Sequence, residues 1–80
     1  MTRYFIDTFD GALDVRDATG ADFSSYDEAC TEARRAVRDM IRDYVDDGGS
    51  RPLGVSVRNR DGKTVYALRL ALSESVDRDE

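Results

Sequence analysis

The sequence predicts an α+β domain with a four-stranded antiparallel sheet and one amphipathic helix on one face, in the two-layer order β-β-α-β-β. The prediction starts from one long segment with helical periodicity, which lies between two shorter segments. Each shorter segment is centred on an Asp-Gly pair flanked by apolar residues that alternate with polar ones. The chain has 80 residues, which suits a single domain. We expect this domain to span residues 1–72 and the acidic residues 73–80 to form a frayed tail.

The first element expected is a hairpin around Asp10-Gly11, since this pair favours a two-residue turn. In that register the pairs on the core side are Ile6 with Val15 and Thr8 with Leu13. The other side pairs Phe5 with Arg16, Asp7 with Asp14 and Phe9 with Ala12. The register sets two like charges, Asp7 and Asp14, opposite each other. A three-residue loop therefore stays open as the alternative.

The segment from Tyr26 to Val45 predicts the helix. Its apolar residues recur at spacings of three and four: Tyr26, Ala29, Cys30, Ala33, Val37, Met40, Ile41, Tyr44 and Val45. Ser25 and Glu28 stand at the positions of a capping box, which predicts the start of the helix. Gly48-Gly49 predicts its end.

The second hairpin is expected around Asp61-Gly62, the preferred pair for a two-residue type I′ turn. The pairs on the core side are then Val57 with Tyr66, Val55 with Leu68, and Leu53 with Leu70. The other side pairs Arg58 with Val65, Ser56 with Ala67, and Gly54 with Arg69. A slip by one residue would turn the apolar set away from the core, so this register is well specified.

The composition argues against several kinds of active site. The chain has one Cys and no His, so it can form neither an internal disulfide nor a zinc site of Cys and His, and it lacks an imidazole base. We therefore predict a protein without enzyme activity and without a cofactor. The formal net charge of −5 disfavours nonspecific binding to nucleic acid or to an anionic membrane. The start of the chain has no signal-peptide pattern, and a lone thiol suits a reducing compartment, so we expect a cytoplasmic protein.

Three further features have ordinary structural explanations. The acidic residues of the first hairpin could bind Ca²⁺ or Mg²⁺, but they lack the spacing of an EF-hand, and we interpret them as turn and surface residues: Asp7, Asp10, Asp14, Asp17 and Asp22. The helix also carries a ridge of Arg34, Arg35, Arg38 and Arg42. Acidic residues lie three or four positions away from it, so we expect a solvated face with internal ion pairs. Cys30 lies on the apolar stripe, which predicts a small buried side chain.

The sheet face away from the helix is the candidate interaction surface. One helix covers only one side of the sheet, so the other side is expected to expose apolar residues next to basic ones. The residues expected there are Phe5, Phe9, Arg16, Arg58, Val65, Ala67, Arg69 and Ala71. Because a chain this small has a marginal core, we predict that it acts through protein association, first as a homodimer through this face. An unidentified protein is the other partner that this surface would suit.

The alternative function is a nucleic-acid-binding or antitoxin-like regulatory module that uses the second hairpin. Residues 48–72 hold five basic residues and one acidic residue, although the whole chain is acidic. Exposed Phe5 and Phe9 beside arginines would resemble sheets that stack nucleic-acid bases on aromatic rings.

The order of short motifs resembles a bacterial family of small uncharacterised proteins whose members open with M-R-Y-[FY]-F-[DN]. The matching positions are Arg3-Tyr4-Phe5-Ile6-Asp7, Gly11, Asp17, Gly20, Ala29, Glu32-Ala33 and Arg58-Asn59-Arg60-Asp61-Gly62 followed by Val65. This chain has an extra residue before Arg3, and Ile6 stands where an aromatic residue is usual. The family is a domain of unknown function, so the resemblance implies the fold and no activity.

A fainter resemblance to HicB-type antitoxins rests on the R-Y-F opening and on the passage from Ser25 to Val45. It implies the antitoxin-like regulatory role. The aromatic, Gly- and Pro-rich segment expected before the helix is missing from this chain.

Overall fold

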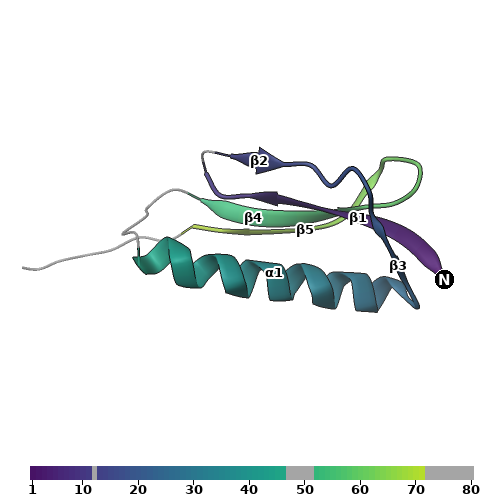
Figure 1. Cartoon of the computed structure of the whole chain (residues 1–80), viewed down its shortest axis with the longest axis horizontal. Helices are drawn as coiled ribbons and strands as arrows, with labels where there is room; N and C mark the ends of the chain where they lie inside the picture. Colours follow the sequence, from purple (N-terminus) through teal and green to yellow (C-terminus); the bar gives the residue numbers. More distant parts are fainter. Residues whose placement is uncertain (12, 47–51, 72–80) are drawn as a thin grey trace, which may run out of the picture.

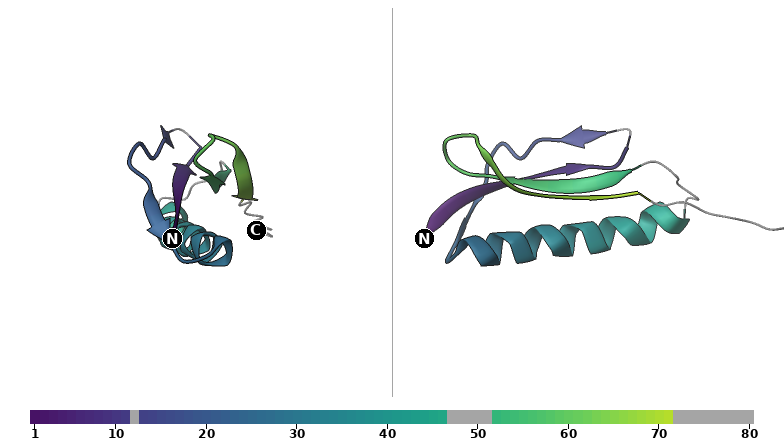
Figure 2. Two further views of the ribbon diagram at one scale, coloured as in Figure 1. Left: turned by 90° about the vertical axis from the view of Figure 1, so that its right-hand side faces the viewer. Right: turned by 180° about the vertical axis from the view of Figure 1, so that it is seen from behind.

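The computed structural model describes residues 1–11, 13–46 and 52–71, and it confirms the α+β class (Figure 1). The described elements are β1 (Thr2–Phe9), β2 (Asp14–Val15), β3 (Ala21–Phe23), α1 (Tyr26–Asp46), β4 (Leu53–Arg58) and β5 (Thr64–Leu70). The helix α1 runs along one face of an antiparallel sheet, as the views from the end and from behind also show (Figure 2). The tail expected at residues 73–80 lies outside the described residues.

The long strands β1 and β4 form the centre of the sheet, whose order is β2-β1-β4-β5. The short strand β2 pairs with the end of β1, at Thr8 and Phe9, while β3 pairs with its start, from Thr2 to Tyr4. Among the described residues the expectation of four strands is therefore refined to five, because Ala21–Phe23, expected only to lead into the helix, forms a further short strand after the turn at Asp17.

The register expected for the first hairpin is wrong by two residues. Thr8 pairs with Val15 and Phe9 with Asp14, so the connection is longer than an Asp-Gly turn. Asp10 closes it: its N–H donates to the Leu13 carbonyl at 3.2 Å, and its carboxylate accepts from the Leu13 N–H at 2.9 Å. This register moves Asp14 away from Asp7, which removes the expected repulsion. It also leaves Leu13 60% and Val15 50% exposed, so neither is the core residue that we expected.

The second hairpin confirms five of the six expected pairs, from Leu53 with Leu70 to Val57 with Tyr66. The exception is Arg58, which pairs with Thr64 instead of Val65. The reason is a three-residue loop: the Gly62 N–H donates to the Asn59 carbonyl at 3.0 Å, and Gly62 has a φ of 84°. This loop alone would shift the register by one residue. A bulge at Val65 restores it and turns Val65 toward the core.

The core lies between α1 and the sheet. Its buried residues are Phe23, Ala29, Ala33, Val37, Tyr44, Leu53, Val55 and Val57. Ala29 and Ala33 are fully buried, which lets the helix backbone approach the strands closely. Cys30 is buried as expected, with 4% of its surface exposed.

The helix begins where the capping residues predicted it. The Glu28 N–H donates to the Ser25 hydroxyl at 3.1 Å, which is one half of the expected capping box. The other half is shifted by one residue, because the Glu28 carboxylate accepts from the N–H of Ser24 at 3.0 Å and from its hydroxyl at 2.8 Å. Gly48-Gly49, the expected end, lies outside the described residues.

Candidate functional site

The sheet face away from α1, which we call the outer face, is built from rows of residues that pair across β1, β4 and β5. The rows are Phe9, Gly54 and Arg69; then Asp7, Ser56 and Ala67; then Phe5, Arg58 and Thr64. In the middle row, the side chains of Ser56 and Ala67 are small, so the surface of the outer face is recessed there. Larger side chains stand in the rows on either side.

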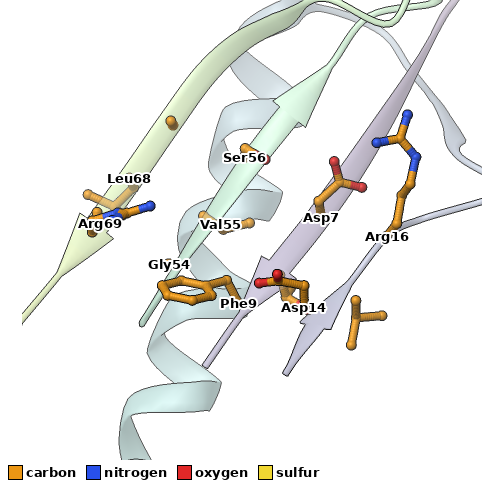
Figure 3. Close-up of a pocket in the computed structure, with 12 residues that line it drawn as sticks. Asp7, Phe9, Asp14, Arg16, Gly54, Val55, Ser56, Leu68 and Arg69 are labelled. Atoms are coloured by element: carbon orange, nitrogen blue, oxygen red, sulfur yellow. The ribbon is translucent and has the colours of Figure 1, made fainter. Parts of the chain in front are cut away.

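A groove with a volume of about 490 Å³ follows this recessed part of the outer face (Figure 3). Its floor includes Gly54, Ser56 and Ala67. Figure 3 shows the Phe9 and Arg69 side chains at one end of it. On the β2 side, Asp14 and Arg16 line it as well. The groove therefore presents an aromatic ring and charges of both signs around a floor of small residues.

At one end of the groove, an arginine covers an aromatic ring. The Arg69 guanidinium carbon lies 5.2 Å from the centroid of the Phe9 ring, within the range of a cation–π contact. Gly54 lies between these residues in the row, and a Cβ there would come within 2.6 Å of the Leu68 carbonyl oxygen. Glycine is thus required by the close approach of β4 to β5, and Phe9 and Arg69 meet across the space that it leaves.

A nearly buried ion pair lies on the other side of the groove, which Asp7 lines. Arg58 is only 8% exposed, and its Nε and Nη2 donate to the two carboxylate oxygens of Asp7 at 2.7 and 3.1 Å. The same Nη2 also donates to the Asp17 carbonyl at 2.8 Å, and the guanidinium carbon lies 4.9 Å from the Phe5 ring centroid. This bidentate pairing balances the charge of Arg58, so the role of this residue is to stabilise the outer face.

Asp17 fixes the segment that crosses beside this ion pair. Its carboxylate accepts from the N–H groups of Ile6 at 3.1 Å, Thr19 at 3.1 Å and Gly20 at 2.9 Å, while its own N–H donates to Asp7 at 2.8 Å. Gly20 has a φ of 74°, and a Cβ there would lie 2.8 Å from the Phe5 ring. The turn at Asp17 therefore brings Gly20 against one side of Phe5.

These contacts lower the pKa of both carboxyl groups. For Asp7, partial burial acts to raise the pKa, but the hydrogen bonds from Arg58 and from the Asp17 N–H, with the charges of Arg58 and Arg16, outweigh it. The pKa of Asp17 is lowered first by the hydrogen bond from the Gly20 N–H, which partial burial opposes, and further by those from Ile6 and Thr19. Both groups therefore favour the ionised form.

The structure brings together most of the residues predicted for the outer face. Phe5, Phe9, Arg58, Ala67 and Arg69 all lie there. Arg16 lines the groove from the residue after β2, and Ala71 is exposed directly after β5. Val65 belongs to the core side instead, because the bulge turns it. Phe5 and Phe9 are only partly exposed, so this face shows less apolar surface than expected.

Sequence reasoning missed the network that joins Asp7, Arg58 and Asp17. We interpreted Asp17 as a turn residue, which is correct, and Asp7 as a solvated surface residue, which is wrong. A signal was present, since opposite charges at Asp7 and Arg58 were expected on the same face. Their pairing joins residues 51 positions apart, and it depends on β1 lying next to β4.

The acidic residues of the first hairpin do not converge on one point. In the part of the chain that the structure describes, there is no group of three or more His, Cys, Asp or Glu side chains that could hold a metal ion. Asp22 pairs with Arg3 at 3.2 Å, and Asp10 caps its own loop. On α1, Arg35 pairs with Glu32 at 2.9 Å, one of the ion pairs that the ridge of arginines predicted. No helix among the described residues combines the length and the apolar character needed to cross a membrane.

Comparison with known proteins gives a family and no activity. No curated protein and no solved structure is significantly similar to this chain. These comparisons also give no support to the fainter resemblance to HicB-type antitoxins. Residues 3–71 match the family described as "Domain of unknown function (DUF6894)", a span that contains every strand from β2 to β5, the helix and nearly all of β1, and the chain therefore belongs to that family.

Proposed function

We propose that the chain is a non-enzymatic protein that acts through protein association, with the outer-face groove as its contact surface. The groove carries the proposal, because a floor of small residues lies between the Phe9–Arg69 contact and the Asp7–Arg58 ion pair. Aromatic and arginine side chains are enriched in protein interfaces. Because both arginines are held by internal contacts, little side-chain entropy would be lost when a partner binds.

The same geometry gives little support for acid–base chemistry. A carboxyl group that acts as a general acid near neutral pH needs a raised pKa. The pKa of Asp7 is lowered instead, and its charge is already balanced by Arg58. Asp7 thus supports the structure of the face, which agrees with a binding function.

The alternative, binding of nucleic acid, has weaker support. It needs aromatic rings that are free to stack on bases and basic side chains that are free to meet phosphates. Arg58 is buried against Asp7, and the rings of Phe5 and Phe9 each have an arginine guanidinium over them. We therefore propose protein association in preference to the antitoxin-like role.

Two measurements test the groove. Affinity capture from native extract compares the wild type with Ser56→Glu, which puts a charge on the groove floor and leaves Phe9 and Arg69 in place. The matched control is Ala21→Glu at an exposed position of β3. Sedimentation equilibrium with the same three proteins, at tens of micromolar, measures self-association. In the capture experiment we expect Ser56→Glu to weaken binding of the captured protein about tenfold or more, and Ala21→Glu to leave it within about twofold. Sedimentation shows whether the groove also carries the contact between two copies.

The proposal fails if Ser56→Glu captures the same proteins as the wild type and associates with itself equally well. Circular dichroism of both variants must match the wild type, so that a loss of binding is not a loss of folding. A second copy is the simplest partner, and two surfaces compete for that contact: the outer face, as expected from the sequence, and the edge of β5.

A further inference from the structure

The two sides of the sheet end differently. On the β1 side, the sheet ends in β2 and β3, which have two and three residues and are separated by the turn at Asp17. On the other side it ends in β5, which has seven residues and pairs only with β4 among the described residues. A long unpaired edge presents main-chain N–H and C=O groups to another strand, and proteins commonly block such edges.

The sequence of β5 has few of the usual blocking features. Thr64–Leu70 contains no proline, and Arg69 is its single charged residue. Arg69 points to the outer face, where it contacts Phe9. The bulge at Val65 disturbs only the start of the strand, and the Val65 carbonyl accepts from the Tyr26 hydroxyl at 3.0 Å. This leaves Tyr66–Leu70 as a regular edge.

The apolar residues on the core side of the sheet are less deeply buried on β5 than on β4. On β4, Leu53, Val55 and Val57 are 0%, 4% and 0% exposed. Their neighbours on β5 in the same rows are Leu70, Leu68 and Tyr66, and all three are only partly buried. Tyr66 has the Arg34 guanidinium carbon 6.0 Å from its ring centroid, which leaves Leu68 and Leu70 as the more purely apolar part. Within the ranges that the structure describes, the apolar row therefore continues to the edge and has no neighbour beyond β5.

We propose that two copies of this chain join edge to edge along β5, in an antiparallel pair about a two-fold axis. This inference rests on the proposed self-association and assigns that contact to the edge, so that the outer-face groove stays free for a different protein. With Leu68 at the axis, Leu68 faces Leu68 of the second copy, and Tyr66 faces Leu70 of the second copy. Both helices then lie on one side of a continuous sheet, and both grooves lie on the other.

A second copy suits this edge better than an unrelated strand. A two-fold pairing satisfies both unpaired edges at once and closes the assembly. In the register above, Arg69 lies opposite Ala67 of the second copy, so the charges are not placed directly opposite each other. The apolar row of each copy receives an identical row as its missing neighbour.

Sedimentation equilibrium of four proteins tests the edge. Leu68→Lys places a charge in the middle of the contact, which should raise the dimer Kd about tenfold or more. Val15→Lys is the matched control, since Val15 is a half-exposed apolar residue on the opposite side of the sheet. We expect Val15→Lys and the groove variant Ser56→Glu to leave the dimer Kd within about twofold of the wild type.

Hydrogen exchange of the wild type gives a second readout that needs no variant. We expect amides between Tyr66 and Leu70 that point away from β4 to exchange at least about tenfold more slowly in the dimer than in dilute monomer. Loss of the dimer in Leu68→Lys alone, together with this protection, supports the inference.

Loss of the dimer in Ser56→Glu alone, with unchanged exchange in β5, overturns the edge contact and assigns the dimer to the groove. A wild type that stays monomeric at tens of micromolar also overturns it. In that case the groove is still tested separately by affinity capture, so the two proposals can fail independently.

Discussion

At the scale of single residues, Asp17 is the most connected side chain of the outer-face network. One carboxylate accepts three main-chain N–H groups, and the backbone of the same residue contacts both Asp7 and Arg58. The segment that lies against Phe5 is therefore held by one side chain. Asp22, only five positions later, makes an exposed ion pair with Arg3, with side chains 48% and 45% exposed.

We predict that Asp17→Ala lowers the free energy of unfolding by about 2 kcal/mol, because it leaves partly buried N–H donors without their acceptor. The control Asp22→Ala removes an exposed pair and should cost less than about 1 kcal/mol. Urea unfolding followed by circular dichroism measures both losses. Equal losses in the two variants would show that the network does not stabilise the fold.

At the scale of the elements, two glycines of the second hairpin are required for different reasons. Gly54 in β4 has an ordinary backbone but no room, since a Cβ would meet the Leu68 carbonyl oxygen of the neighbouring strand at 2.6 Å. Gly62 in the loop has open space, but its φ of 84° is one that other residues rarely adopt.

We predict that Gly54→Ala destabilises the protein more than Gly62→Ala does. The first change must push two paired backbones apart and should cost about 2–3 kcal/mol. The second only forces alanine into a left-handed conformation and should cost about 1 kcal/mol. Thermal unfolding of both variants checks the order, and the reverse order would contradict a close contact between β4 and β5.

The elements also show why the two hairpins differed in predictability. In the second hairpin, an alternating apolar face and an Asp-Gly turn pointed to the same register, and the loop length and the bulge offset each other. In the first hairpin the turn signal had little support, because β2 has only two residues and both are exposed. There the pairing is fixed by the hydrogen bonds within the Asp10 loop and by the Asp17 carboxylate, which accepts a hydrogen bond from the Ile6 N–H in β1.

Part of the candidate site could also be predicted from the sequence. Strand alternation alone placed Phe5, Phe9, Arg58 and Arg69 on one face, and the structure agrees. Alternation does not fix which strands are neighbours in the sheet, so it predicts neither the contact of Arg58 with Asp7 nor that of Arg69 with Phe9. These contacts convert an expected exposed patch into a partly filled groove.

At the scale of the whole molecule, several carboxylates make the stability depend on pH. The pKa values of Asp7 and Asp17 lie below the ordinary value of 3.8, for the reasons given above. The pKa of Glu28 lies below 4.5, chiefly because its carboxylate accepts the Ser24 N–H and hydroxyl at the start of α1. These groups connect β1, the Asp17 turn and the helix, so their protonation weakens the fold at several places.

A carboxyl group with a lowered pKa in the folded state binds its proton more readily in the unfolded chain. Its stabilising contribution is therefore complete above the unfolded pKa and is lost as the pH falls through the folded pKa. We predict that the free energy of unfolding stays level from pH 7 to about 5 and then falls through pH 4 toward 3. In the variant with Asp7→Asn and Asp17→Asn, the loss should be shallower, because only Glu28 of these groups still titrates. Urea titrations at each pH measure both curves, and a wild type whose stability is unchanged at pH 3 would show that these contacts add nothing to the ionised fold.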